Sequence, residues 1–328
     1  MDMSRRPRRN RQSKAIRSLV RETHLRADQL VYPLFLLDGE DQAVEIPSLP
    51  GNYRLSIDKA KRTVEECMNS NLQSFILFPV IDESLKDSYA TYSYDENNVY
   101  LRAIRELKTT FPEMCIITDI ALDPYSSDGH DGVVKDGGIL NDETLPILAK
   151  MGLAQAEAGA DILGPSDMMD GRVGFIRQTL DEKGFSSTAI MSYTAKYASA
   201  FYGPFRDALS SAPKGGDKKS YQMDPANKRE ALVEAELDDQ EGADYLMVKP
   251  ALLYLDIIQQ LDQNFEIPIA AYNVSGECSM VKAAVGNGWL TEEEAMMEML
   301  LSIKRAGANI VISYFAKEAA EWLQKNGS

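Results

Sequence analysis

The sequence predicts an α/β fold, and within that class a TIM-type (β/α)8 barrel. Eight short apolar runs alternate with amphipathic segments along the 328 residues. The runs are rich in Ile, Val, Tyr and Phe at successive positions, which is typical of strands buried on both faces of a parallel sheet. Eight such units fit a closed barrel. An open doubly wound sheet is the alternative, but no GxGxxG motif follows the first run and the chain has no P-loop motif.

The predicted strands follow one another along most of the chain. They are Val31–Leu36, Ser74–Val80, Cys115–Leu122, Asp161–Asp167, Thr188–Lys196, Tyr245–Pro250, Ile267–Ser275 and Asn309–Phe315. The amphipathic segments between them predict helices over Ser56–Ser70, Asn97–Thr110, Asp142–Ala158, Pro225–Glu241 and Thr291–Arg305. Ser56, Asn141 and Thr291 are placed to cap three of these helices, and Glu294 completes a capping-box pattern with Thr291.

A short glycine motif precedes three of the predicted strands. Gly-Ala-Asp occurs at residues 159–161 and 242–244, and Gly-Ala-Asn occurs at 307–309. Because glycine often closes the C-terminus of a helix, we expect each motif to end a helix and to turn tightly into the next strand.

Charge divides the chain into two parts. Residues 1–26 carry nine Lys or Arg side chains against Asp2 and Glu22, a net charge of +7. The other 302 residues carry 26 basic and 48 acidic side chains, a net charge of −22. We therefore expect a basic N-terminal arm over residues 1–26 and a single barrel domain over residues 27–328. Because an acidic body repels phosphates, we expect the arm to lie on an acidic surface of its own or a neighbouring subunit rather than on nucleic acid.

Composition also bears on the cellular compartment. Hydrophobic residues make up 44% of the chain and charged residues 26%, as in ordinary soluble globular proteins. Arg17 interrupts the apolar stretch Ala15–Val20, so we expect neither a signal peptide nor a membrane span. Cys67, Cys115 and Cys278 are sparse and form no CxxC motif, which favours buried, inert thiols in a reducing compartment. We expect a cytoplasmic protein.

Two consecutive predicted strands end in lysine. Lys196 ends the fifth apolar run and Lys249 lies at the end of the sixth. Adjacent strands lie about 4.8 Å apart, so the two ammonium groups would perturb each other at the carboxyl rim of the barrel. A desolvated lysine beside another cation loses its proton readily and can attack a ketone to form a Schiff base. A single strand-end lysine is more simply interpreted as a solvated residue, whereas two on consecutive strands favour a catalytic role.

The end of the third predicted strand, from Thr118 to Gly132, is rich in acids and glycine. Asp and Gly favour turns. Carboxylates at a barrel rim can also bind a hard cation, or hold ammonium groups and water for proton transfer. Both interpretations stay open for the segment, and Asp123 and Asp131 are its best functional candidates.

Five motifs follow in order along the second half of the chain. They read MSYTAKYAS at residues 191–199, FYGPFR at 201–206, KSYQMDP at 219–225, MVKPA at 247–251 and YNVSGE at 272–277. With YPLF at residues 32–35 and the dipeptide SY at 313–314, they resemble the porphobilinogen synthase (δ-aminolevulinic acid dehydratase) family over nearly the whole chain.

The resemblance implies a reaction that the lysine pair can serve. Members of this family condense two 5-aminolevulinate molecules to porphobilinogen with loss of two waters, an early step of tetrapyrrole synthesis. By the family's pattern, Lys249 forms the Schiff base with the first-bound substrate and Lys196 with the second. The same pattern implies Ser275 and Tyr314 as ligands of the first substrate's carboxylate. For the second carboxylate it implies Arg206, Lys218 and Gln222. The Gly-rich, charged stretch Ser210–Ser220 is expected to form a lid over the second site.

The resemblance also bears on metals and assembly. Zinc-dependent members have three cysteines where this chain has Ala121, Asp123 and Asp131, so zinc is not expected. Oxygen-ligated Mg²⁺, a monovalent cation or no active-site metal stay open. Asp167 resembles an active-site acid, and Glu234 resembles a remote Mg²⁺ ligand that activates some members. A homo-octamer is implied as well.

Two other classes of protein fit parts of the pattern. A class I aldolase-like barrel uses a single strand-end lysine as its Schiff base. A non-catalytic acidic barrel would use the basic arm to recruit partners. A requirement for both Lys196 and Lys249 would favour the condensing enzyme.

Overall fold

The computed structural model describes residues 3–209 and 213–326, and within them eight parallel strands close into a barrel. Closure follows because the last strand pairs with the first as well as with its predecessor. The barrel strands are β1 (Leu30–Leu36), β4 (Ser74–Pro79), β5 (Cys115–Ile120), β8 (Ile162–Pro165), β9 (Ala189–Lys196), β10 (Tyr245–Lys249), β11 (Ile269–Asn273) and β12 (Ile310–Ser313). Each overlaps one predicted apolar run, so the predicted (β/α)8 barrel is confirmed.

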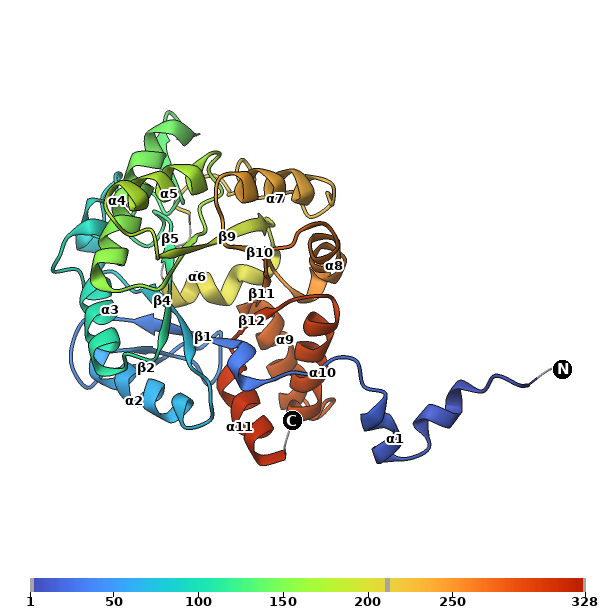
Figure 1. The fold of residues 1–328 in the computed structure, drawn as a ribbon. Coiled ribbons are helices and arrows are strands. Elements are labelled where there is room, and N and C mark those ends of the chain that lie inside the picture. Colours follow the sequence, from blue (N-terminus) through green and yellow to red (C-terminus); the bar gives the residue numbers. More distant parts are fainter. Residues whose placement is uncertain (1–2, 210–212, 327–328) are drawn as a thin grey trace.

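Helices surround the barrel (Figure 1). They are α2 (Ile57–Met68), α3 (Val99–Thr110), α4 (Asn141–Ala158), α5 (Arg172–Glu182), α6 (Gly203–Leu209), α7 (Glu230–Gln240), α8 (Leu255–Asn264), α9 (Ser275–Gly286), α10 (Glu292–Arg305) and α11 (Ala316–Asn326). All five predicted helical segments contain or overlap one of them. Two hairpins were not predicted, because three-residue strands are too short to show a period of two. They join β2 (Ala43–Glu45) to β3 (Tyr53–Leu55), and β6 (Val133–Lys135) to β7 (Gly138–Leu140).

The capping predictions were partly wrong. Ser56 and Thr291 occupy N-cap positions, but neither side chain accepts a backbone N–H of the helix that follows. The Ser56 hydroxyl instead donates to the Asp58 carboxylate over 2.6 Å, which draws it away from the helix amides. Asn141 is the first residue of α4 rather than its cap.

The glycine motifs behave as predicted and add one interaction that the sequence did not reveal. Gly159, Gly242 and Gly307 have φ values of 107°, 97° and 120°, a region that favours glycine at helix C-termini. In each motif the side-chain oxygen of the third residue accepts a backbone N–H at the start of the preceding barrel strand over 2.8 Å. The pairs are Asp161 with Ile116, Asp244 with Ile190, and Asn309 with Ile269. Three pairs of neighbouring strands, β5 with β8, β9 with β10 and β11 with β12, are thereby fastened at the amino-terminal end of the barrel.

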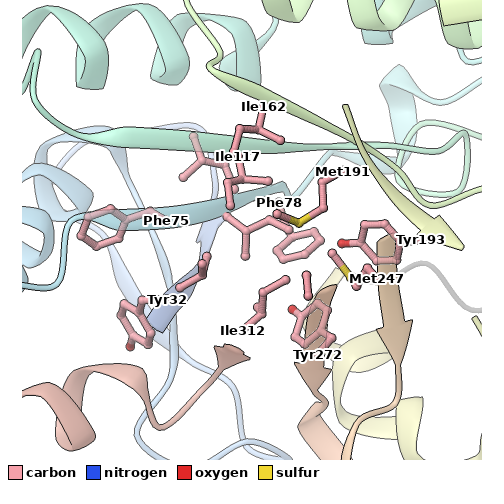
Figure 2. Close-up of a cluster of buried hydrophobic side chains, with 14 of the residues drawn as sticks. Tyr32, Phe75, Phe78, Ile117, Ile162, Met191, Tyr193, Met247, Tyr272 and Ile312 are labelled. Atoms are coloured by element: carbon pink, nitrogen blue, oxygen red, sulfur yellow. The ribbon is translucent and has the colours of Figure 1, made fainter. Parts of the chain in front are cut away.

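The barrel interior is filled with large apolar and aromatic side chains (Figure 2). Aromatic rings gather towards the carboxyl ends of the strands, where Phe35 stacks on Phe78 at 5.7 Å between ring centroids and on Tyr314 at 6.1 Å. Phe205 meets Phe78 edge-on at 5.0 Å. Burial of these rings supplies much of the apolar stabilisation of this end. It also creates a desolvated floor for any polar group that the strand ends carry.

The N-terminal segment lies apart from this core. A short 3₁₀ turn (Pro7–Arg11) and helix α1 (Lys14–Leu19) contain no buried residue, and the segment extends away from the barrel (Figure 1).

Nowhere in the described part of the chain is a helix both long and apolar enough to cross a bilayer. Of the cysteines, Cys67 and Cys278 are buried as predicted, whereas Cys115 is partly exposed.

Candidate active site

Two lysines from neighbouring strands meet at the carboxyl rim of the barrel. Lys249 of β10 and Lys196 of β9 are register partners in the parallel pairing of their strands. Both residues are almost completely buried, with exposed fractions of 4% and 7%. Because side chains of register partners point the same way, the two amines share one desolvated region.

Aromatic rings surround the Lys249 amine. Its Nζ lies 4.5 Å from the ring centroid of Tyr272, 4.8 Å from that of Phe205, 4.9 Å from that of Tyr193 and 5.5 Å from that of Tyr202. These faces attract a cation but offer less than water does to an ammonium group. Burial therefore lowers the pKa of Lys249, and the charge of Lys196 lowers it further, to about 7. A large share of Lys249 is then a neutral, nucleophilic amine near neutral pH.

Lys196 is held by groups of the opposite polarity. Its Nζ donates to the Asp131 carboxylate over 3.3 Å and also to the backbone carbonyl oxygen of Ser166. The two lysines thus differ in surroundings: Lys249 faces aromatic rings, whereas Lys196 faces a carboxylate.

Asp131 links Lys196 to a third buried lysine. Lys218 donates to Asp131 over 2.6 Å and to Asp123 over 3.2 Å. Burial alone would raise the pKa of Asp131, but the charges of Lys196 and Lys218 lower it to about 2. Burial likewise opposes the charge of Lys218, while Asp123 and Asp131 raise its pKa. Asp131 is therefore ionised and holds the two ammonium groups together.

Burial raises the pKa of three other acids of the site. Burial raises the pKa of Asp119 to about 6 in spite of the nearby lysines, and it raises the pKa of Asp167 to about 7. Burial also raises the pKa of Asp123. With pKa values of about 6 and 7, Asp119 and Asp167 can both give and take protons near neutral pH. Asp119 was not singled out from the sequence, although a lone acid inside a buried apolar run was a signal that could have found it.

These groups open onto a cavity at the rim. Six of the site residues named from the sequence line it: Asp123, Lys196, Arg206, Lys218, Gln222 and Lys249. Sequence reasoning missed four further lining residues: Asp119, Ser166, Tyr202 and Phe205. Small-molecule sites commonly combine a few charged groups with aromatic walls.

Four other candidates lie behind the wall of the cavity. Asp131 is fully buried against the lysines. Asp167 is also fully buried, and its Oδ1 accepts the backbone N–H of Met169 over 2.8 Å. The Ser275 hydroxyl accepts the backbone N–H of Phe205 over 3.0 Å. The Tyr314 hydroxyl lies 3.0 Å from that of Tyr272, one of the rings that face Lys249.

The segment after α6 folds across this site. Residues 210–212 of the lid predicted over Ser210–Ser220 lie outside the described residues. In the remainder, the Lys214 backbone N–H donates to the carbonyl oxygen of Asp128 over 3.1 Å. His130 Nε2 lies 2.8 Å from the carbonyl oxygen of Gly215, and its Nδ1 lies 3.1 Å from the Tyr221 hydroxyl. These contacts hold residues 213–221 over the acids that follow β5.

Glu234 lies outside the lysine cavity. It faces a separate polar cavity that is also lined by Asp170, Asp224, Glu230 and Gln222. Burial raises the pKa of Glu234 to about 7. Gln222 lines both cavities, so the two sites are neighbours. Among the described residues, no three His, Cys, Asp or Glu side chains converge as a metal cluster.

Known proteins resemble this chain over its whole length. The family model described as "Delta-aminolevulinic acid dehydratase" matches residues 4–322. A delta-aminolevulinic acid dehydratase of Bradyrhizobium diazoefficiens is 52% identical over 328 residues, covering 100% of this chain and 93% of the relative. One from Chlamydia pneumoniae is 51% identical, covering 99% of this chain and 98% of the relative. A crystal structure of the Toxoplasma gondii delta-aminolevulinic acid dehydratase (porphobilinogen synthase), in complex with the reaction product porphobilinogen, superposes with a TM-score of 0.96. It shares 50% identity and covers 98% of this chain and 92% of that one.

Replacing Asp131 by Asn should destabilise the protein strongly at neutral pH. The variant leaves Lys196 and Lys218 buried with their shared negative charge removed, which costs about 3 kcal/mol. Since the pKa of Asp131 lies below its ordinary value, its stabilisation is complete above about pH 5 and is lost as the pH falls towards about 2. Urea unfolding of both proteins should show a difference that narrows in acid. Equal stability at neutral pH would contradict the role given to Asp131.

Proposed function

The chain belongs to the delta-aminolevulinic acid dehydratase family, and we propose that its two buried lysines each activate one substrate molecule. It is a lyase that condenses two molecules of 5-aminolevulinate to porphobilinogen with the loss of two waters. The observation that supports the division of labour is the register pairing of Lys249 with Lys196 in one buried region. Each of the two ketones must be made more electrophilic, and each lysine amine can do this for one ketone by forming an imine with it.

Lys249 forms the first Schiff base. Its neutral amine attacks the ketone carbon of one 5-aminolevulinate, and the carbinolamine oxygen leaves as water once it has been protonated. The product is an iminium cation, which the four surrounding aromatic faces stabilise better than they stabilise a localised ammonium group. Asp119 lines the same cavity and, with its pKa near 6, supplies and recovers the protons of this step.

Lys196 forms the second Schiff base. Its amine attacks the ketone of the second 5-aminolevulinate, and the buried acids Asp123 and Asp167, whose pKa values burial raises, take up and return the protons of this step. Once both ketones are imines, loss of a C–H proton next to one imine gives an enamine carbon. That carbon attacks the other electrophile and makes the carbon–carbon bond of the ring. The amino group of the other substrate then attacks the remaining imine carbon, which forms the carbon–nitrogen bond, closes the ring and expels one lysine amine. Elimination of the second lysine amine, with loss of the remaining C–H protons, gives the pyrrole.

The substrate carboxylates require fixed partners. We assign Ser275 and Tyr314 to the first, because both lie beside the aromatic groups that surround Lys249. Arg206, Lys218 and Gln222 are assigned to the second, because they line the same cavity as the two lysines and supply the donors that a carboxylate needs. Arg206 can bind a carboxylate through two parallel N–H bonds, whereas Lys218 acts as a point charge.

Borohydride reduction in the presence of 5-aminolevulinate should leave a stable adduct on Lys249, identified by peptide mass mapping. Lys249→Met should abolish this adduct and lower turnover about 1000-fold or more. Lys196→Met should still form the Lys249 adduct but make no porphobilinogen, which distinguishes the two lysines. Lys183→Met, at an exposed lysine directly after α5, is the matched control and should behave as the native enzyme. A native enzyme that yields porphobilinogen without an adduct on Lys249 would contradict the assignment.

We propose that the Glu234 cavity binds an activating Mg²⁺. Its lining is rich in carboxylate and amide oxygens, which are the ligands this ion prefers. Mg²⁺ usually keeps several waters and takes only one or two carboxylates, so Glu234 with Asp170 or Glu230 nearby suffices. Bound there, the ion would neutralise the acids of a cavity that shares Gln222 with the catalytic one. With aspartates in place of the zinc-binding cysteines, thiolate ligation of zinc in the active site is not possible.

Removal of divalent cations with EDTA should lower activity, and Mg²⁺ should restore it. Glu234→Ala should abolish this response and also the heat of Mg²⁺ binding in titration calorimetry, because the carboxylate that contacts the ion is lost. Glu236→Ala changes an exposed acid on the same helix and should keep both. Normal stimulation of the Glu234→Ala enzyme by Mg²⁺ would contradict the proposal that Mg²⁺ binds at Glu234.

We further propose that the basic arm joins subunits of a homo-octamer in the cytoplasm. The arm carries a net charge of +7 and buries none of its helical residues within its own subunit, while the rest of the chain carries −22. An arm of one sign that leaves its own barrel is suited to bind the opposite charge of a neighbour.

Deletion of residues 1–26 should therefore yield smaller assemblies in light scattering than the full chain at the same concentration. High salt should shift the full chain in the same direction, because it screens the attraction between arm and barrel. An unchanged mass after deletion would show that the arm does not join subunits.

A further inference from the structure

Glu277 is a buried carboxylate whose partners are neutral. Its exposed fraction is 0%. Its hydrogen-bond donors include the side-chain amide of Asn273 and the backbone N–H groups of Val274 and Leu252, at 2.8, 3.0 and 2.9 Å. Burying a carboxylate is costly unless several donors satisfy it. The number and geometry of these bonds show that the surrounding backbone is arranged around Glu277.

The two carboxylate oxygens bind different strand ends. Oε2 accepts from Asn273 and Val274, at the end of β11 and directly before Ser275. Oε1 accepts from Leu252, three residues beyond Lys249 in the loop that follows β10. One side chain thus bridges the loop that carries the imine-forming lysine and the turn that carries Ser275.

A third strand end is joined to the same group. The side-chain oxygen of Asn273 accepts from the Ser313 hydroxyl over 2.8 Å and from the Cys278 thiol over 3.1 Å. Ser313 ends β12 and directly precedes Tyr314. The chain of bonds from Glu277 through Asn273 to Ser313 therefore connects the ends of β10, β11 and β12.

The turn that Glu277 holds is also packed tightly against the wall of the site. A Cβ atom on Gly276 would lie 2.5 Å from the carbonyl oxygen of Phe201, so only glycine fits there. The neighbouring Ser275 hydroxyl accepts the N–H of Phe205, a ring that faces Lys249. A displacement of this turn would therefore move one wall of the lysine cavity.

A glutamate at the third position of a helix often caps that helix only. Its carboxylate then accepts the N–H of the residue before the helix, as Glu277 does with Val274. The bond from Oε1 to Leu252 does not cap α9, because Leu252 lies in the loop that follows β10. That second bond is what separates a link between two site-forming segments from an ordinary cap.

We propose that Glu277 is a positioning residue that fixes the loop after Lys249 relative to Ser275, so that one substrate's ketone and carboxylate are held at the same time. This inference rests on the proposed function, since it takes Lys249 as the imine-forming lysine. Glu277 itself does not touch the substrate. It sets the separation between the amine that attacks one end of the molecule and the hydroxyl that binds the other.

Glu277→Gln tests the proposal with little change of shape. Whichever way the amide turns, its NH2 group faces an N–H of either Leu252 or the Asn273–Val274 pair, so one of the two links breaks. We expect the rate of borohydride-trapped imine formation at saturating 5-aminolevulinate, and kcat/KM, to fall by about 100-fold. Glu241→Gln is the matched control, because Glu241 accepts the Gly174 N–H over 3.0 Å and joins two outer helices. Its melting temperature should fall by about as much as that of Glu277→Gln, but it should trap imine at the native rate.

The outcomes separate this proposal from the one on which it rests. If the native enzyme forms no adduct on Lys249, the proposed function fails. If the native enzyme forms the adduct and a folded Glu277→Gln enzyme forms it equally fast, the positioning role is overturned. Should Glu277→Gln fail to fold, Ser313→Ala removes the link to Asn273, together with the bond that the same hydroxyl accepts from the Phe315 N–H. A slower trapping rate in that variant supports the network, and a native rate overturns it.

Discussion

The exclusion of water from one ammonium group is the constraint on which the site depends. A lysine with an exposed fraction of 4% cannot keep its usual proton affinity when four aromatic rings and a second lysine surround it. The closed barrel creates this condition, because parallel strands place Lys249 and Lys196 side by side at the rim and fill the space below with aromatic side chains. Nucleophilic chemistry at neutral pH follows from packing rather than from any special property of the residue.

The other charged groups of the site form a separate, ion-paired cluster. Asp131 lies between Lys196 and Lys218, fully buried and ionised, and with Asp123 it raises the pKa of Lys218. Asp119 and Asp167, which form no ion pair among the described residues, have pKa values raised towards neutrality by burial and can carry protons. One region of the protein therefore contains fixed charges that bind and orient, together with acids that titrate near neutral pH. A condensation that forms and hydrolyses imines needs both kinds of group.

Much of this could be predicted from the sequence, and the reasons for the failures are physical. Eight buried strands leave a strong signal because their apolar runs are continuous, and the lysines stand out because they end two of those runs. Asp119 was not predicted as a site residue, because it lies within an otherwise apolar strand and the loop that follows is rich in acids. The rings around Lys249 come from three separate segments, with Tyr202 and Phe205 in one and Tyr193 and Tyr272 in two others, so no single local pattern joins all four. The role of Glu277 depends on a bond to Leu252, 25 residues earlier in the chain, which only the fold reveals.

A direct titration of Lys249 tests the central claim. The enzyme can be labelled with ¹³C at the lysine ε-carbons, and the resonance that disappears in Lys249→Met can be followed with pH by NMR. The account predicts a pKa of about 7 for Lys249. Replacing Lys196 by Met should move it upward, because a neighbouring positive charge is removed. A value near the ordinary 10.5 in the native enzyme would contradict the claim that burial and Lys196 prepare this amine for reaction.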